Sequence, residues 1–447
     1  VPIETAEAAD RTTRFSAFCH PCLRRIVRFP PENRDLIESA DMSSADSAPL
    51  ILLKNAELFA PDAQGKCQVL IGAGRVLEIQ PSGASSPRGV ALETVDLHGR
   101  RVVPGFIDGH VHVTGGGGEG GFATRIPPLP LHRYTHNGVT SVVGLLGTDD
   151  CARTVRELVA TVLGLREQGL GAWAWCGGYH LPPATLSGDV RSDIAFIDPI
   201  LGVGELAISD HRSSQPTLDE LLRVASEAHV GGLMSGKAGI VHLHLGDGVR
   251  GLELVRRALA QSELPARVFN PTHVNRRRAL FAEAIELARH GCHVDITAFP
   301  VDEGEDAWSA ADALQGYLES GAPAERVSVS SDAGGCLPCF DAQGRMSHMD
   351  IGSPGALLAT IGELLARGLP LQQILPAFTR NVAELLRLPR KGVLAAGADA
   401  DLLVLDEQSR ICDVMLGGRW QVREGQAVAR GPLDSSPPPF DPGNGNN

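Results

Sequence analysis

The fold is decided by one stretch of the sequence, Val103-Pro104-Gly105-Phe106-Ile107-Asp108-Gly109-His110-Val111-His112. It has the pattern of an apolar strand that ends in two histidines and runs into a glycine-rich loop. Because residues i and i+2 of a strand point to the same side, the side chains of His110 and His112 can converge on one cation. The stretch therefore predicts a strand with a metal site at its carboxyl end.

Outward from this strand, residues 103–384 alternate apolar runs with amphipathic helical stretches. Apolar runs lie at 139–143 and 240–244, and residues 218–229 and 280–289 have helical spacing. Alternation of this kind is typical of βα units around a parallel sheet. We therefore predict an α/β fold with a (β/α)8 TIM-like barrel over 103–384. Functional groups of such barrels stand at the carboxyl ends of the strands.

Short apolar runs separated by Gly- and Pro-bearing turns lie on both sides of this middle part and are typical of antiparallel strands. We predict that residues 49–102 and 385–430 pair into one small β-sandwich domain. Residues 1–48 have no helical or strand periodicity, so we expect a disordered or non-native extension, with Met42 as the start of the folded protein. Residues 431–447 are rich in Pro, Ser, Gly and Asn, and we expect a disordered tail.

Charge and composition exclude several classes of partner. A net charge of −13 and an aromatic content of 4% argue against binding to nucleic acid or to an anionic membrane surface. No apolar run approaches the roughly 18 residues that a transmembrane helix needs. The nine cysteines are scattered, and Cys19 and Cys22 have no βαβ context for a redox pair. We therefore expect reduced thiols and a cytoplasmic location.

Three more potential metal ligands stand at the ends of apolar runs. His244 and His273 each end such a run, and Asp332 follows another one. A single histidine in this position is more often a core residue, but four histidines and an aspartate at strand ends favour a shared metal site. His242, two residues before His244, is predicted to lie deeper in the barrel and to be structural.

The order of these residues resembles that of the amidohydrolase superfamily, in which a His-x-His pair is followed by an acidic residue or carboxylated lysine, two more histidines and an aspartate. Several local segments are also similar to those of the isoaspartyl dipeptidases within it. The similarity spans roughly residues 50–428. The segments are GGGGE at 115–119, GLLGTD at 144–149, GYH at 178–180, AISDHR at 207–212, PTHVNR at 271–276 and SSD at 330–332.

The resemblance implies metal-dependent hydrolysis of β-aspartyl dipeptides. Two divalent cations, with Zn2+ as the expected metal, would share and activate a bridging water. Asp332 would carry the proton of this water to the leaving amine, and Tyr179 would donate a hydrogen bond to the developing oxyanion. The implied metal ligands are His110, His112, the residue at position 205, His244, His273 and Asp332.

Recognition of such a substrate requires groups for one ammonium and two carboxylates. The resemblance implies that Glu119 binds the ammonium and that Arg212 and Arg276 bind the carboxylates. The planar fork of an arginine suits this role because it donates two parallel hydrogen bonds. Gly117 and Thr148 would add further contacts to the substrate.

The chain departs from the family pattern at two positions. Glu205 stands seven residues before Arg212, where the resemblance implies a carboxylated lysine. A glutamate is shorter by on the order of 3 Å, so the backbone must approach the metals more closely, and a bulge at 202–204 would permit this. We hypothesise that Glu205 bridges two metals. Cys336 replaces a serine that would contact the substrate carboxylate, and its thiol is a weaker donor.

Two alternatives stay open at this point. Another amidohydrolase could act on N-acyl amino acids or cyclic amides, although these substrates do not need two carboxylate-binding arginines together with Glu119. A catalytically silent amidohydrolase-like scaffold would instead have lost its metal ligands. As partners we expect a small dipeptide substrate and, from the resemblance, other copies of the chain in a homo-oligomer, but neither nucleic acid nor a membrane.

Overall fold

The computed structural model describes residues 50–340 and 346–429. The expectations for residues 1–48, which include Met42 and the pair Cys19 and Cys22, lie outside the described residues. The same holds for the tail at 431–447.

Six parallel strands of the described chain form one sheet, in the order β11-β10-β9-β8-β7-β6. β12 and β13 form a second parallel pair, in which β12 lies beside β11 and β13 beside β6. The backbone amide of His112, directly after β6, donates to the carbonyl of Ala333, after β13, over 2.9 Å. The predicted parallel α/β arrangement is therefore confirmed as a half-barrel sheet with a neighbouring pair. The strands are β6 (Phe106–Val111), β7 (Val139–Gly144), β8 (Gly171–Cys176), β9 (Ile200–Ile208), β10 (Val241–Leu245), β11 (Phe269–Thr272), β12 (Val294–Thr297) and β13 (Val327–Ser330).

Helices follow most of these strands, and the two helices predicted at 218–229 and 280–289 lie within α5 and α7. α5 begins with a capping box between Thr217 and Glu220 and ends at Gly236 in a left-handed conformation. Within 50–340 and 346–429, no helix combines the length and the apolar composition that crossing a bilayer requires. The α-helices are α2 (Leu131–Thr135), α3 (Val155–Glu167), α4 (Val190–Phe196), α5 (Leu218–Ser235), α6 (Glu253–Gln261), α7 (Arg278–Arg289), α8 (Ala310–Glu319), α9 (Gly355–Ala366), α10 (Leu371–Ile374) and α11 (Arg380–Leu385). The 3-10 helices are η2 (Phe122–Thr124), η3 (Ala266–Val268), η4 (Val274–Arg276), η5 (Ala324–Arg326) and η6 (Leu375–Phe378).

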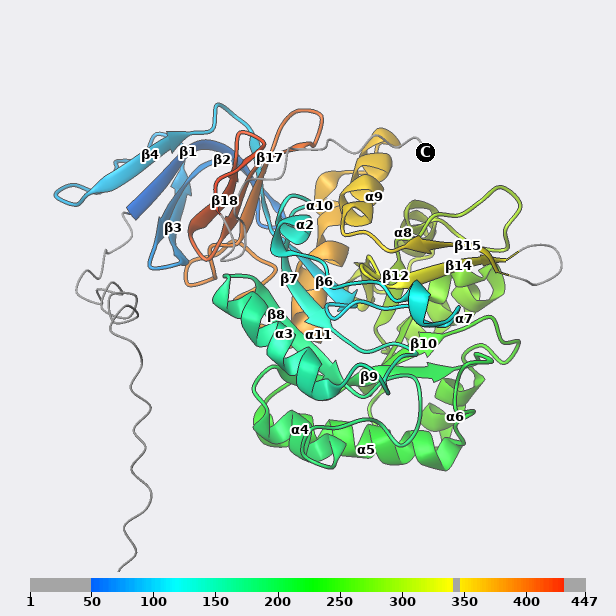
Figure 1. Ribbon diagram of the computed structural model, residues 1–447. Helices are drawn as coiled ribbons and strands as arrows, with labels where there is room; N and C mark the ends of the chain where they lie inside the picture. The colour runs from blue at the N-terminus through cyan, green and yellow to red at the C-terminus, as the bar shows by residue number, and fades with distance from the viewer. Residues whose placement is uncertain (1–49, 341–345, 430–447) are drawn as a thin grey trace, which may run out of the picture. The chain divides into compact units, whose positions relative to one another are not determined.

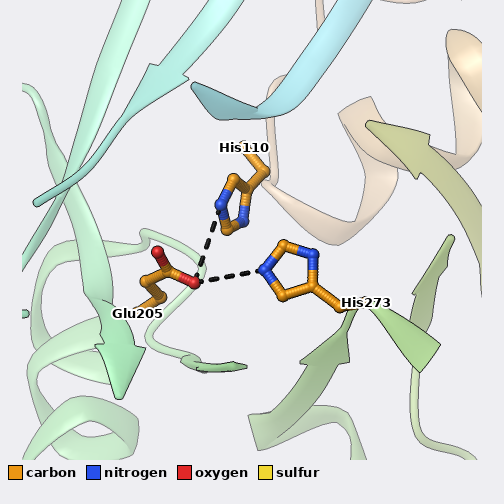
Figure 2. A group of neighbouring side chains, drawn as sticks. All are labelled: His110, Glu205 and His273. Carbon is orange, nitrogen blue, oxygen red and sulfur yellow. Dashed lines mark hydrogen bonds and ion pairs between the residues drawn. The ribbon is translucent and has the colours of Figure 1, made fainter. Parts of the chain in front are cut away.

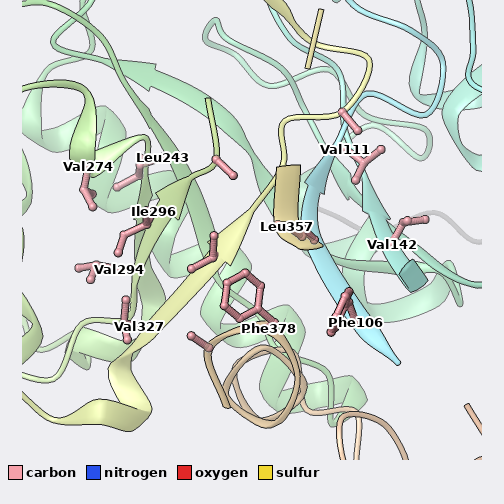
Figure 3. Packing of buried hydrophobic residues seen from close by; sticks show 14 of the residues in the cluster. Phe106, Val111, Val142, Leu243, Val274, Val294, Ile296, Val327, Leu357 and Phe378 are labelled. Carbon is pink, nitrogen blue, oxygen red and sulfur yellow. The ribbon is translucent and has the colours of Figure 1, made fainter. Parts of the chain in front are cut away.

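An apolar core joins the parallel strands to the helices. Phe106 and Leu243 from the strands are buried in the same cluster as Leu357 of α9 and Phe378 of η6 (Figure 3). Full burial of one such side chain stabilises the fold by about 1.5–3 kcal/mol. The strands are therefore held firmly, and the side chains at their carboxyl ends have a rigid base.

The strand-rich segments from the two ends of the described chain pair with each other, as predicted (Figure 1). They form one nine-stranded sheet in the order β19-β18-β17-β16-β5-β1-β2-β3, with β4 beside β1. The link is the antiparallel pair of β16 and β5, in which Leu402 lies opposite Pro104. The strands are β1 (Leu50–Phe59), β2 (Ala63–Gly72), β3 (Arg75–Pro81), β4 (Leu92–Asp96), β5 (Arg101–Pro104), β16 (Leu402–Leu405), β17 (Ile411–Leu416), β18 (Arg419–Arg423) and β19 (Gln426–Ala427). A separate antiparallel pair consists of β14 (Cys336–Phe340) and β15 (Met346–Ile351).

Candidate metal centre and substrate site

The six predicted metal ligands gather at the carboxyl ends of the parallel strands. The four histidines and Asp332 lie there because each stands near the end of an apolar strand or directly after it, and parallel strands present these ends at one edge; Glu205 lies within β9, three residues before its end. All six side chains are buried. They are His110 in β6, His112 after β6, Glu205 in β9, His244 in β10, His273 after β11 and Asp332 after β13.

His110, His112 and Asp332 form one group whose donor atoms could hold a metal ion. Oδ1 of Asp332 lies 3.1 Å from Nε2 of His112 and 3.4 Å from Nε2 of His110. Within the described part of the chain, His110 Nε2, His112 Nδ1 and Asp332 Oδ1 are buried and have no hydrogen-bond partner. Buried polar atoms are normally satisfied, so these orphaned donor atoms fit a cation.

A second group consists of His110, Glu205 and His273 (Figure 2). Glu205 Oε2 lies 3.6 Å from Nε2 of His110 and 3.4 Å from Nε2 of His273. His244 belongs to neither group, but its Nδ1 lies 3.0 Å from the same carboxylate oxygen. The other oxygen of Glu205, Oε1, lies 3.6 Å from Nε2 of His112. The two oxygens of Glu205 thus face histidines of both groups.

The local electrostatics favour positive charge between the carboxylates. Burial alone would raise the pKa of Glu205, but His110 and His244 outweigh it and hold this pKa well below its usual range. Burial would likewise raise the pKa of Asp332, but the neighbouring imidazoles of His110 and His112 lower it. Burial opposes the charged form of His110, yet Glu205 and Asp332 raise its pKa to about 9. Two ionised carboxylates therefore face the histidines at this point.

The backbone of β9 brings Glu205 to the other ligands. Along β10, Val241 pairs with Val203 and Leu243 with Leu206, so β9 has one extra residue between these pairs. The predicted bulge is therefore present. A Cβ on Gly204 would come within 2.6 Å of the backbone oxygen of His242, so only glycine permits this close approach.

Two of the candidate ligands have a left-handed backbone. His273 has a φ of 58° and Asp332 a φ of 52°. This conformation costs a non-glycine residue about 1–2 kcal/mol. Such strain is commonly found at functional sites, where the surrounding structure enforces the direction of a side chain.

The residues predicted to bind the substrate lie next to His244. The Tyr179 hydroxyl is 2.8 Å from His244 Nδ1. Arg212 Nη2 and Arg276 Nη1 each lie 3.4 Å from His244 Nε2. Glu119 joins them because Arg212 Nη1 donates to its Oε1 over 3.3 Å. The predicted carboxylate and arginines are therefore brought together beside the metal-binding groups.

Three further predicted residues lie around Glu119. The Thr148 hydroxyl donates to Glu119 Oε1 over 2.6 Å. Burial and the neighbouring charge of Glu119 raise the pKa of the Cys336 thiol to about 12, so this thiol stays neutral. Gly117 forms an antiparallel bridge with Arg125, and a Cβ at this glycine would lie 2.5 Å from the Thr124 oxygen. Gly117 thus shapes the loop that carries Glu119.

Comparison with known proteins agrees with this geometry. The amidohydrolase family model matches residues 101–421. The chain belongs to the amidohydrolase family. A solved β-aspartyl dipeptidase from Fervidobacterium islandicum AW-1, in complex with β-Asp-Leu, is 40% identical, with a TM-score of 0.79, over 86% of this chain and 99% of that one. The resemblance to isoaspartyl dipeptidases is thus confirmed. The chain is a hydrolytic enzyme, and the silent-scaffold alternative is not supported.

Two other similar proteins share a smaller fraction of their residues with this chain. An allantoinase from Deinococcus radiodurans is 26% identical over 420 residues, which cover 83% of this chain and 90% of the relative. An L-hydantoinase from Arthrobacter aurescens, solved at 17% identity to this chain, has a TM-score of 0.61 over 85% of this chain and 98% of that one. The second likeness shows the fold alone.

Asp210 is a buried residue of this amidohydrolase site that the sequence analysis missed. Its Oδ1 accepts from Arg212 Nε over 3.1 Å, and its Oδ2 accepts from Arg212 Nη2 over 2.8 Å. Its Oδ2 also lies 3.0 Å from His244 Nε2. Burial opposes ionisation of Asp210, but His244 and Arg212 hold its pKa well below the usual range. Its position two residues before Arg212, inside the matching segment 207–212, was a usable signal.

Arg153 is a second missed residue of this amidohydrolase, and it holds the glycine-rich loop. Its guanidinium donates to the backbone oxygens of Thr114, Gly116 and Ile126 over 2.9–3.1 Å. It also pairs with Asp149 over 2.7 Å. No local motif of the sequence indicates this role, because the three carbonyls lie far from Arg153 along the chain.

His242, predicted to be structural, is buried in β10 two residues before His244. Its ring stacks on Trp175, with centroids 5.3 Å apart. Burial and the neighbouring His110 lower its pKa to about 3, which keeps the ring neutral.

Proposed function

We propose that this amidohydrolase cleaves the amide bond of β-aspartyl dipeptides with the help of two divalent metal ions, Zn2+ being the expected species. The proposal is supported above all by Arg212 and Arg276, which contact His244, together with Glu119, which accepts from Arg212. A dipeptide of this kind needs one anionic and two cationic contacts around its scissile bond. The 40% identical β-aspartyl dipeptidase supports the same substrate class.

We further propose that the eight parallel strands close into a (β/α)8 barrel. Support comes from β12 lying beside β11 and β13 beside β6, and from the parallel bridge between Val111 and Ala333. The nine-stranded sheet would fold over as a β-sandwich, because side chains of β1, β2, β16 and β17 share one apolar cluster.

The proposed metal ligands follow from the two groups of donor atoms. When bound, the metal ions would supply Lewis acidity and lower the pKa of water, so that a nucleophile exists near neutral pH. Glu205 would bridge the two ions, since its oxygens face histidines of both groups. The ligands would be His110, His112, Glu205, His244, His273 and Asp332.

Asp332 and Tyr179 would assist the bond cleavage. The carboxylate of Asp332 is buried beside His110 and His112 and would accept a proton from the attacking water and deliver it to the leaving amine. Burial and the charge of Glu205 raise the pKa of Tyr179 well above its usual range. Its hydroxyl therefore remains protonated and donates to the oxyanion.

Substrate orientation would depend on charged contacts. Glu119 would accept hydrogen bonds from the substrate ammonium, with Thr148 holding its carboxylate in place. Arg212 is already oriented by two hydrogen bonds to Asp210, and Arg276 donates to the backbone oxygen of Leu245 over 3.1 Å. Fixed guanidinium groups lose less entropy when they bind a carboxylate.

Hydrolysis of β-Asp-Leu and of α-Asp-Leu, each with added Zn2+ and after treatment with a chelator, tests this function. We expect cleavage of the β-linked peptide alone, and its loss on chelation. Equal cleavage of both peptides would contradict the proposed specificity. If the Zn2+-loaded protein cleaves neither peptide, the substrate class is wrong, and N-acyl amino acids and cyclic amides become the next substrates to assay.

A further inference from the structure

A chain of buried hydrogen bonds leads from Asn270 through His242 to His110. Asn270, in β11, donates from Nδ2 to the backbone oxygen of His293 over 2.8 Å. A carbonyl oxygen only accepts, so this bond orients the amide with Oδ1 on the side of His242. His242 Nδ1 lies 2.6 Å from that Oδ1.

The orientation of the amide determines where His242 carries its proton. Because Asn270 Oδ1 only accepts, Nδ1 of His242 must be the donor. The ring is 2% exposed and, within the described residues, no carboxylate is hydrogen-bonded to it. A second proton would bury an unpaired charge, which is costly. Nε2 of His242 therefore presents a lone pair.

His110 is the next residue in this series of hydrogen bonds. Its Nδ1 lies 2.8 Å from His242 Nε2, so Nδ1 of His110 is the donor of this bond. Because Nδ1 of His110 carries the proton of this bond, Nε2 is the ring nitrogen left to bind a cation. This atom faces Asp332 Oδ1 at 3.4 Å and Glu205 Oε2 at 3.6 Å, and His110 belongs to both groups of potential metal ligands.

We propose that Asn270 and His242 are positioning residues that hold His110 in the tautomer required of a metal ligand, with Nε2 unprotonated and directed between Glu205 and Asp332. The inference rests on the proposed metal centre. An outer partner of a ligating histidine fixes its tautomer and ring orientation, and its loss commonly costs about 10–100-fold in metal affinity.

The outer hydrogen-bond partner of His110 distinguishes it from His112 and His273. The outer partner of His273 is the hydroxyl of Thr297, 2.7 Å from Nδ1, and a hydroxyl either donates or accepts. His112 Nδ1 has no hydrogen-bond partner within the described chain. An amide with one orientation, followed by a neutral imidazole, specifies the proton position at His110, whereas at His244 the carboxylate of Asp210 fixes a proton on Nε2.

Variants at His242 separate positioning from packing. His242→Phe keeps a ring against Trp175 but removes the acceptor for His110. His242→Gln places an amide oxygen near the former Nε2 and can still accept. The matched control is His293→Phe, which removes a 2% exposed imidazole whose Nε2 has no partner among the described residues. Zn2+ affinity is measured by competition with a chelator, and folding by the thermal unfolding midpoint.

We expect Zn2+ binding about 10–100-fold weaker in His242→Phe, largely restored in His242→Gln and unchanged in His293→Phe, with similar unfolding midpoints. Wild-type Zn2+ affinity in His242→Phe would overturn the inference. So would equal losses in His242→Phe and His293→Phe, because these would reflect packing alone.

The tautomer itself is measured on the Zn2+-treated wild-type protein with 15N-labelled histidine. Long-range 15N–1H spectra should show His242 protonated at Nδ1 only, its signals being assigned by their absence in His242→Gln. Protonation at Nε2 would overturn the inference whatever the variants bind. If the wild-type protein binds no Zn2+, the proposed metal centre fails, and this spectrum alone decides whether Nδ1 of His242 is the donor in the hydrogen-bond chain.

Discussion

Glu205 stands where the family resemblance implies a longer, carboxylated lysine, and it reaches the other candidate ligands from a bulged strand. The bulge in β9 and the close packing of Gly204 on His242 make this possible. Once there, the carboxylate is buried and its two oxygens face different histidines. In the proposed metal centre, this carboxylate would supply the negative charge that the resemblance assigns to the lysine-derived group.

Glu205→Gln should lose metal, because the amide has no negative charge to balance the cations. We expect a loss of affinity no smaller than the roughly 10–100-fold that removal of an outer partner causes, measured as metal bound per chain. Glu119→Gln is the matched control, since Glu119 contacts Thr148 and Arg212: it should keep its metal and show a raised KM. Full metal content in Glu205→Gln would show that this carboxylate does not bridge.

Tyr179→Phe should lower kcat more than it changes KM. The hydroxyl is proposed to donate to charge that develops only during the reaction, and loss of one such donor costs about 10²–10³-fold in kcat. Steady-state kinetics on β-Asp-Leu measure both constants. A raised KM with an unchanged kcat would instead assign Tyr179 to binding of the ground state.

The glycine-rich loop and the start of α3 act together as one element of the site. Arg153, directly before the helix cap at Thr154, donates to loop carbonyls on both sides of Glu119. Asp149 balances its charge. Burial opposes ionisation of Asp149, but the Ala152 amide and Arg153 lower its pKa below the ordinary value.

Asp149→Asn tests this element through the pH dependence of stability. A carboxylate with a lowered folded pKa stabilises the fold above its unfolded pKa, near 4, and this contribution disappears as the pH falls through the folded value. Urea unfolding should therefore show Asp149→Asn less stable than wild type at pH 5–7, with a gap that narrows below about pH 4. Asp302→Asn, at an exposed carboxylate, serves as the control. A gap that stays constant down to pH 3 would contradict this account.

The two ends of the described chain stabilise the protein together. β16 pairs with β5, which leads directly into β6 and its two histidines. One apolar cluster contains Leu53 and Val69 from the N-terminal strands together with Leu402 and Met415 from the C-terminal strands. Residues about 350 positions apart in the sequence therefore share one core.

Leu402→Ala should destabilise the whole protein. Leu402 is fully buried in that cluster, and removal of its side chain to Cβ costs about 2–5 kcal/mol. The free energy of unfolding in urea measures this loss. Val90→Ala, at a side chain that is 50% exposed, should change it by no more than about 0.5 kcal/mol. A loss of less than about 1 kcal/mol in Leu402→Ala would show that the two segments are not coupled.

Local periodicity in the sequence predicted the parallel α/β core and the strands of the two end segments, and the family resemblance implied the full set of candidate ligands. Period-two spacing places His110 and His112 together, and the position of Glu205 relative to Arg212 indicates a carboxylate in place of the lysine. Only the tertiary structure decided how Asp210, Arg153 and His242 act. The contacts that decide these roles join Asp210 to His244, Arg153 to Thr114 and His242 to His110, which lie 34, 39 and 132 residues apart in the sequence. Such contacts depend on strand register and packing, which no local pattern specifies.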